Sequence, residues 1–559
     1  MTATVQGSPA ARPVQGLWRR QLHHYPNTGP RITYLAIVVL ATIVLYYQFY
    51  IPGAVSPAII AHFGMTFNYY VYIIVVANAV GAFGSLAAGL ADRWGRANLV
   101  AYGLVITGAL ILFGVPNAPN ELTYAILFAA VGVVEGIILV ATPALVRDFS
   151  PQLGRASAMG FWTLGPVVGS LVVAVVSSNT LSHLVAWQDQ FIICGIVGLV
   201  VAAIAVVGLR ELSPPLRDQL MVSIRDRALI EAKARGLKVD ELLHRPWRQM
   251  LHLDVIGSAF AIAVFLIFYY TAVGFFTVYF AALHGYSLST ANSLGNWFWA
   301  FDAGALIVVG ILSDIVRVRK PFMACGAVGA IVMTIIFLNL GSGTGYSTFA
   351  IVISFLAVFL AIAYAPWMAG YTETVEKHNP ALTATGLAIW GWIIRAVIAI
   401  SLLILPAVVG SMTPLVTYGP TVTTLSVKYA PELATLAAIS PKTQAALAAN
   451  PTAAAPAAVA EIATAFHIGP AAATARFTAL GTVPTSDLAY MKAHGSQVVT
   501  AAAAAPGEWR NWWWVCVGGQ VLFLPLILLM AGRWSSRRAR KDADEHERRV
   551  QEELATLET

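Results

Sequence analysis

Charged residues are scarce in this chain, and their scarcity decides its class. Only 11% of the 559 residues are Asp, Glu, Lys or Arg, while 58% are hydrophobic, and the mean hydropathy is +0.72. A soluble globular domain carries about 25% charged residues. The composition therefore excludes a soluble protein and predicts an all-α integral membrane protein. The net charge of +7 does not indicate nucleic-acid binding, because the basic residues cluster beside apolar segments.

Cysteine frameworks and enzyme motifs are also missing. The three cysteines lie in apolar runs and have neither disulfide nor metal-ligand spacing. The chain has no phosphate-binding Gly-Lys motif, no His pair at metal spacing and no serine nucleophile elbow. We therefore predict that the protein is not an enzyme and binds no cofactor or metal. The polar break at 211–253 is also too short to hold the nucleotide-binding domain of an ATP-driven pump, so transport is coupled to an ion gradient or is not coupled at all. The acids within the spans favour protons, and the predicted driving force is therefore a proton gradient.

Long apolar runs divide the chain into twelve expected spans, since about 20 apolar residues cross a bilayer. Six precede the polar break, five follow it, and the last comes after a long insertion. The predicted organisation is a tail (1–31), a six-helix bundle (32–210), a charged linker (211–253), helices 7–11 (254–409), an Ala- and Pro-rich insertion (410–509), helix 12 (510–532) and a charged tail (533–559).

Basic residues give the orientation. Lys and Arg fall in alternate short loops, on the same side as the charged linker, and the opposite short loops have none. Because basic loops stay inside, we predict that both termini are cytoplasmic in a multi-pass protein of the cell membrane. The insertion is then outside, where stretches 443–449 and 457–466 either form short helices over the outer mouth or belong to a spacer. Trp512, Trp513 and Trp514 are expected to form an aromatic belt at re-entry.

The two halves of the chain carry an internal repeat. The sequence GILSD at the end of the eighth span matches AGLAD at the end of the second, and paired tyrosines occur in spans one and seven. Three matches at nearly one offset indicate a duplicated six-span unit, which in membranes favours a transporter with its site between the halves. The offsets are 223 for Tyr46 and Tyr269, 222 for Asp92 and Asp314, and 226 for Gly160 and Gly386.

The stretch Gly89–Arg96, which reads GLADRWGR, closely resembles the loop between spans two and three of the major facilitator superfamily. The duplicated twelve-span layout and the charged linker agree with this resemblance. It implies two six-helix bundles that rock between inward-open and outward-open states around a central site. We expect the protein to work as a monomer in the lipid bilayer, on a small-molecule substrate.

In that family the loop acid and arginines form a cytoplasmic latch, closed in the outward-open state. Carried over, Asp92 is the latch acid and engages Arg147, and Asp314 belongs to a degenerate second copy that lacks the glycine and first arginine. The latch is expected to control the rate of switching more than the choice of substrate. The predicted latch residues are Asp92, Arg93, Gly95, Arg96, Arg147 and Asp314.

Three charges stand near mid-span: Glu135, Asp302 and Arg395. Each costs at least about 2.5–3.5 kcal/mol in a bilayer, so each is a functional candidate. Burial favours the neutral form of a carboxylate, so Asp302 or Glu135 is predicted to carry the proton. Arg395 is predicted to hold an anionic substrate, unless it only pairs with an acid to lock the fold.

Further substrate-binding candidates are polar or aromatic side chains near these charges. Asn296 and Trp299 share a helical face with Asp302, and Trp392 precedes Arg395 by three. Spans one and seven line the cavity in the superfamily, which adds Tyr47, Gln48 and Tyr270. Because adjacent helical residues point about 100° apart, not every tyrosine of these spans can face a cavity.

The resemblance leaves the direction of transport open. Buried acids with Arg395 favour a proton symporter that imports a small organic anion. Residues 160–169, ending GPVVG, are similar instead to the span-five motif of proton-driven drug exporters, although Ser170 replaces the next glycine and Gly132 the exporter arginine. A passive facilitator or a substrate-sensing receptor is a lesser alternative. The substrate cannot be named, because its contacts come from several helices.

Overall fold

A computed structural model describes residues 20–86, 94–150, 162–216, 250–341, 343–378 and 383–558. Within these ranges eleven helical segments are long and apolar enough to cross a membrane. A twelfth, shorter apolar helix lies in the fifth position, at Gly165–Thr180. The predicted fold class, two bundles of six spans, is thereby confirmed.

The N-terminal bundle is held together by close helix contacts at glycines. Added Cβ atoms at Gly132 and Gly136 would collide with the backbone carbonyls of Ala77 and Gly81, so α3 and α6 lie backbone to backbone, as small residues permit in membranes. The helices of this bundle are α1 (Thr28–Ala54), α2 (Ser56–Phe63), α3 (Phe67–Leu86), α5 (Arg96–Ala109) with the π-helix η1 (Leu110–Gly114) and the 3-10 helix η2 (Val115–Asn117), α6 (Glu121–Phe149), α8 (Gly165–Thr180) and α9 (Trp187–Gly208).

The C-terminal bundle has an aromatic core around Phe268, Phe337 and Trp513. The ring centroids of Phe268 and Trp513 are 4.9 Å apart, and those of Phe337 and Trp513 are 5.2 Å apart. Its helices are α13 (Leu253–Phe265) and α14 (Ile267–His284), which together make one span, α15 (Leu288–Val316), α16 (Lys320–Leu338), α17 (Tyr346–His378), α18 (Thr383–Val408), α25 (Thr485–Leu526) and the 3-10 turn η5 (Ile527–Leu529).

The insertion is folded and helical, and both predicted short helices are present in it. Its elements are α19 (Met412–Thr417), α20 (Gly419–Lys428), α21 (Ala430–Ala437), α22 (Pro441–Ala449), α23 (Pro451–Phe466) and α24 (Pro470–Leu480). Ile439, Ala458 and Ile462 form part of a small separate core. The Glu461 carboxylate accepts hydrogen bonds from the Ser440 backbone N–H (2.7 Å) and from the Thr443 hydroxyl (2.7 Å), which ties α22 to α23.

The last span differs from its prediction. The helix of this span was expected to begin near residue 510. Instead, α25 begins at Thr485 and continues for 42 residues to Leu526, so one continuous helix connects the insertion to the bundle. Trp512 and Trp513 are buried, and the Trp512 indole N–H donates to the Thr271 hydroxyl (3.1 Å). The predicted aromatic belt is therefore wrong for these two, because the phase of the helix turns them toward α14.

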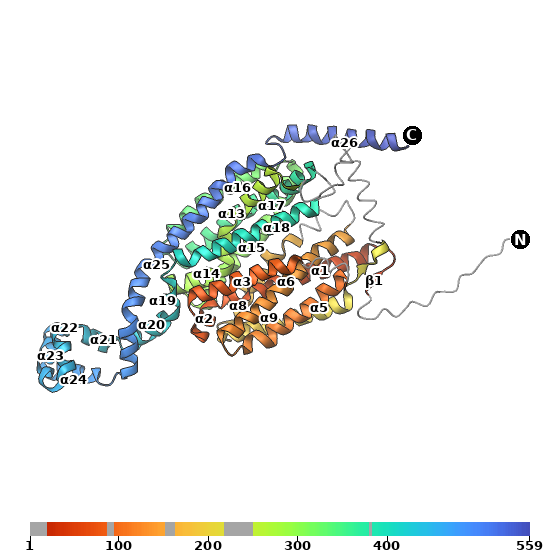
Figure 1. The fold of residues 1–559 in the computed structure, drawn as a ribbon. Coiled ribbons are helices and arrows are strands. Elements are labelled where there is room, and N and C mark those ends of the chain that lie inside the picture. The colour runs from red at the N-terminus through yellow and green to blue at the C-terminus, as the bar shows by residue number, and fades with distance from the viewer. Residues whose placement is uncertain are drawn as a thin grey trace.

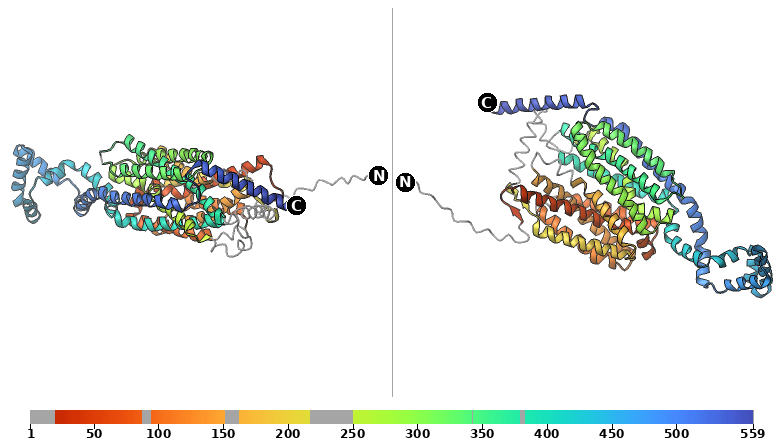
Figure 2. Two further views of the ribbon diagram at one scale, coloured as in Figure 1. Left: turned by 90° about the horizontal axis from the view of Figure 1, so that it is seen from above. Right: turned by 180° about the vertical axis from the view of Figure 1, so that it is seen from behind.

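The two ends of the molecule are distinct. The short strands β1 (Gln21–Leu22) and β2 (Glu211–Leu212) form a parallel pair, and they lie at the same end as the charged helix α26 (Ser536–Glu558) (Figure 1). Helices α20 to α24 project from the opposite end, as two further views confirm (Figure 2). We call these the termini end and the insertion end.

Candidate functional site

Two of the three predicted mid-span charges lie within electrostatic range of each other, on helices of different bundles. Glu135 on α6 is buried, with 6% of its surface exposed, and interacts electrostatically with Arg395 on α18. The carboxylate lies beside Gly81 of α3, and α3 packs against α18. The close α3–α6 packing thus brings the acid of one bundle to the arginine of the other.

Tyrosines from both bundles surround this pair. Tyr46 on α1 lies near Glu135, Tyr270 and Arg395. Tyr50, one turn further along α1, lies near Tyr46, Tyr270 and Tyr364, and the Tyr46 and Tyr50 ring centroids are 5.4 Å apart. We call this set the central cluster. It comprises Glu135, Arg395, Tyr46, Tyr50, Tyr270 and Tyr364.

Asp302 on α15 adjoins the central cluster from the C-terminal side. Its side chain is 3% exposed, and its Oδ2 atom has no hydrogen-bond partner among the described residues. It lies near Tyr364 and Tyr269, and the Tyr269 ring meets Trp299 edge-on with the centroids 5.0 Å apart. A buried carboxyl group is normally satisfied, so this oxygen is suited to a proton or a polar ligand.

Two predicted substrate residues point elsewhere. Gln48 is fully buried, and its amide lies against Gly198 of α9, where a Cβ would collide with it. Tyr47 is equally buried and adjoins Cys194 of α9. Within the described chain neither the Tyr47 hydroxyl nor the Gln48 amide has a hydrogen-bond partner. The structure therefore places Tyr46 in the central cluster instead of its neighbour Tyr47.

Asn296, another predicted substrate residue, belongs to contacts between the bundles toward the insertion end. Its Nδ2 donates to the Ser178 hydroxyl (3.0 Å), and the Ser289 hydroxyl donates to the Ser178 carbonyl (2.6 Å). Asn292 Nδ2 donates to the Ala54 carbonyl (2.8 Å). These bonds join α15 to α8 and α1. The bundles are thus held together on the insertion side.

A small cavity lies at the same junction of α1, α8, α14 and α15. Tyr50 of the central cluster lines it, together with Asn292 and Trp299. Of the predicted residues, Trp299 is therefore close to both the cavity and Asp302, whereas Trp392 is about half exposed on α18.

The first latch is described from Trp94 onward, so Asp92 and Arg93 and their predicted contact with Arg147 lie outside the described residues. Gly95 has φ +90°, a conformation that glycine adopts readily, and it turns the chain into α5. Arg96 Nη1 donates to both carboxylate oxygens of Asp148 at the end of α6 (2.8 Å each). The Arg96 backbone N–H donates to Glu211 (2.6 Å).

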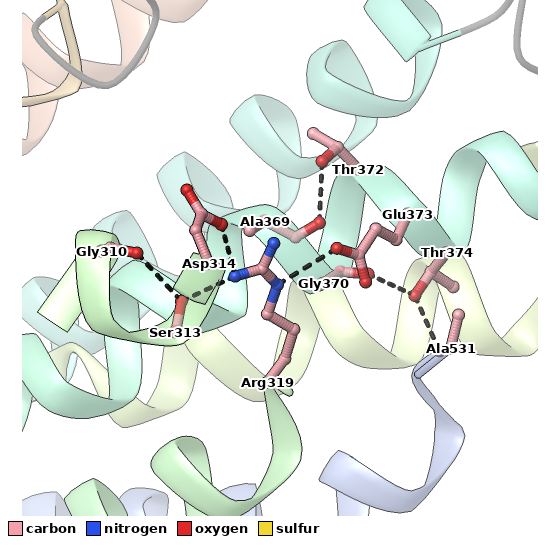
Figure 3. Close-up of polar contacts among 10 residues, drawn as sticks. All are labelled: Gly310, Ser313, Asp314, Arg319, Ala369, Gly370, Thr372, Glu373, Thr374 and Ala531. Atoms are coloured by element: carbon pink, nitrogen blue, oxygen red, sulfur yellow. Dashed lines mark hydrogen bonds and ion pairs between the residues drawn. The ribbon is translucent and has the colours of Figure 1, made fainter. Parts of the chain in front are cut away.

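The predicted second latch, in the C-terminal bundle, is centred on Arg319. Arg319 pairs with Asp314 (2.6 Å) and with Glu373 near the end of α17 (3.1 Å), and it donates to the Ser313 hydroxyl (2.7 Å), as Figure 3 shows. Arg96 and Arg319 are 223 positions apart, and Asp148 and Glu373 are 225 apart, which matches the offset of the repeat. That offset could have identified Asp148, Arg319 and Glu373, which sequence reasoning missed.

The comparisons with known proteins agree with this architecture. Two bundles of six spans with charged and polar side chains between them form an architecture that is typical of membrane transporters. The sequence profile described as "Major Facilitator Superfamily" matches residues 38–402, about two thirds of the chain. The chain therefore belongs to the Major Facilitator Superfamily, and this membership supports secondary transport and not an enzymatic activity.

Solved structures of transporters share the fold. A bacterial homologue of the human lysosomal transporter Spinster, inward-facing and unoccupied, is 17% identical with a TM-score of 0.54, covering 91% of this chain and 100% of that one. The occupied form of the same homologue is 16% identical with a TM-score of 0.55, and the match covers 90% of this chain and 98% of that one. The inward-open xylose transporter XylE from E. coli is 15% identical with a TM-score of 0.50, and the match covers 67% of this chain and 89% of that one. No curated protein matches the chain.

Proposed function

We propose that this protein is a secondary transporter that carries a small organic anion together with a proton across the cytoplasmic membrane. The observation that carries the proposal is the interaction of Glu135 with Arg395 between the two bundles. Arg395 is the substrate-binding cation and Glu135 the proton-binding group. The driving force is the proton gradient, and both termini face the cytoplasm.

The sign of the coupling follows from this pairing. When Glu135 takes up a proton, one negative charge near Arg395 is removed, and Arg395 attracts an anion more strongly. By thermodynamic reciprocity, an anion bound at Arg395 favours the protonated form of Glu135. The two ligands therefore promote one another, which is the requirement for symport. A cationic substrate at Glu135 would instead expel the proton, which is the requirement for antiport.

Asp302 is proposed as a second proton site. It has a buried carboxylate oxygen without a partner among the described residues, and Tyr364 interacts with Asp302, Tyr46 and Tyr270. In this proposal Tyr364 is the member of the central cluster that connects Asp302 with Tyr46 and Tyr270. Tyr46, Tyr50 and Tyr270 offer hydroxyl groups for the uncharged parts of the substrate.

Proton-driven export remains the second candidate, since the glycines of its sequence motif are present on α8. Added Cβ atoms at Gly165 and Gly169 would come within 2.6 Å of Thr42 and Tyr46 on α1. Close helix packing alone accounts for both glycines, so the motif gives export less support than the charge pair gives symport.

Counterflow in proteoliposomes distinguishes the candidates. Liposomes loaded with unlabelled mono- and dicarboxylates are expected to accelerate uptake of the same labelled anion. Arg395→Gln should abolish this exchange, and Arg510→Gln, which removes an exposed arginine bonded to Asn339, should leave it intact. Proton-driven loss of a lipophilic cationic dye, with no anion exchange by the wild type, would replace symport with antiport.

A further inference from the structure

Three helix ends of the C-terminal bundle meet at the termini end. The Ala531 backbone N–H donates to the Thr374 hydroxyl (2.9 Å), so the segment after α25 lies against the end of α17. The Ser536 hydroxyl donates to the Val316 carbonyl (2.8 Å), so the same segment also reaches the end of α15. Figure 3 shows Ala531 and Thr374 beside the second latch, near the start of α16.

This junction collects basic side chains from three elements. Lys320 is the first residue of α16, Lys377 lies in the last turn of α17, and Arg533 follows α25. Lys377 and Arg533 are close enough to Lys320 to repel it electrostatically. Lys320 is nevertheless only 7% exposed. In the described part of the chain it has neither an ion pair nor a hydrogen bond with a side-chain acceptor.

Three acids near this junction pair with cations other than Lys320. Asp314 and Glu373 both pair with Arg319, and Asp542 pairs with Arg533 (2.6 Å). A positive charge on a largely buried side chain is unfavourable without a counter-ion, and repulsion from two neighbouring cations adds to that cost. An anion bound at this position would remove the cost, because lysine is an effective point-charge ligand for phosphate.

We propose that Lys320, Lys377 and Arg533 form a binding site for a phosphate group at the termini end, separate from the transport site. Two sources have this chemistry, the headgroup of an anionic phospholipid and free inorganic phosphate. The position favours the headgroup, because the site lies where the ends of three spans meet the charged helix α26. Basic residues directly after a span attract anionic lipids, and Arg537, Arg538, Arg540 and Lys541 continue the positive surface along α26.

The test measures thermal unfolding of the full-length protein by tryptophan fluorescence. One arm uses nanodiscs of phosphatidylcholine with increasing phosphatidylglycerol, and the other uses lipid-depleted micelles with increasing phosphate at constant ionic strength. We expect a saturable rise of the wild-type Tm in at least one arm. Lys320→Gln with Lys377→Gln should weaken the apparent affinity about tenfold or more, as the loss of charge-assisted bonds implies.

Two further variants keep the result interpretable. Arg533→Gln alters an exposed side chain and leaves Lys320 in place, so it should fold and still weaken the response. Arg548→Gln with Arg549→Gln removes two positive charges, as the double lysine variant does, but at the far end of α26, where both arginines have i,i+4 acidic partners. This control should respond to phosphate and to lipid as the wild type does. A rise with phosphate would identify the free ion, and a rise with phosphatidylglycerol alone would identify the lipid. Wild-type responses from the Lys320 and Arg533 variants, or no response from the wild type, would overturn the site.

Discussion

The two latches are copies of one device with different surroundings. In the N-terminal bundle the Arg96 and Asp148 side chains are 11% and 3% exposed, and Glu211 from the chain after α9 binds the start of α5 as well. In the C-terminal bundle Arg319 is similarly enclosed, but its partners Asp314 and Glu373 are 67% and 43% exposed. Both copies of the repeat therefore contain an arginine–acid pair, and the acid is far less exposed in the N-terminal copy than in the C-terminal one.

The largest expected effect tests this inequality. Asp148→Asn leaves a buried arginine with a weakened partner, and we expect a loss of about 3 kcal/mol in the free energy of unfolding, because breaking a buried ion pair is costly. Glu373→Gln, its counterpart in the other bundle, should cost less than about 1 kcal/mol, because the Glu373 carboxylate is 43% exposed and exposed pairs contribute little. Unfolding in micelles measures both, and equal losses would show that burial does not separate the two latches.

A smaller effect is expected at the contacts between the bundles. Asn292→Ala removes the bond to the Ala54 carbonyl, worth about 1 kcal/mol, so the population open at the insertion end should rise about fivefold. Distances between spin labels on α2 and α15 report this change. Asn339→Ala, which removes a bond within the C-terminal bundle, is the control. An unchanged distance distribution in Asn292→Ala would mean that this bond does not hold the insertion side closed.

The smallest expected effect concerns two adjacent tyrosines. Tyr46→Phe removes a hydroxyl from the central cluster and should raise the KM for the transported anion about threefold, the value of a modest hydrogen bond. Tyr47→Phe removes a hydroxyl that adjoins α9 and should leave KM unchanged. Initial rates of exchange in proteoliposomes compare them. The reverse ranking would return Tyr47 to the substrate site.

Apolar length and the repeat offset were sufficient to predict the spans and the duplicated bundles. They were sufficient because each depends on residues close in sequence or on one constant spacing. The choice between Tyr46 and Tyr47 was not predictable, since it depends on the rotation of α1 against α9. The contact of Glu211 with Arg96 was hidden for a similar reason, because 115 positions separate the two residues.

The last span shows a different limit. The residues before 510 are alanine-rich and not apolar enough to be assigned to a span, yet they form helix readily. Hydropathy therefore located the part of α25 that crosses the membrane and missed its extension to Thr485. The three mid-span charges could be identified from the sequence because a charge within the bilayer has a high free-energy cost. Which charges lie near one another could be known only from the fold, in which Glu135 is near Arg395 and Asp302 is near Tyr364.

The most direct test of the coupling is uptake driven by a pH gradient in proteoliposomes, measured with the anion that gives the strongest counterflow. The account predicts that Glu135→Gln retains counterflow exchange and loses accumulation against a concentration gradient, and that Asp302→Asn lowers accumulation as well. Undiminished pH-driven accumulation by Glu135→Gln would contradict the assignment of the Glu135–Arg395 pair as the coupling site.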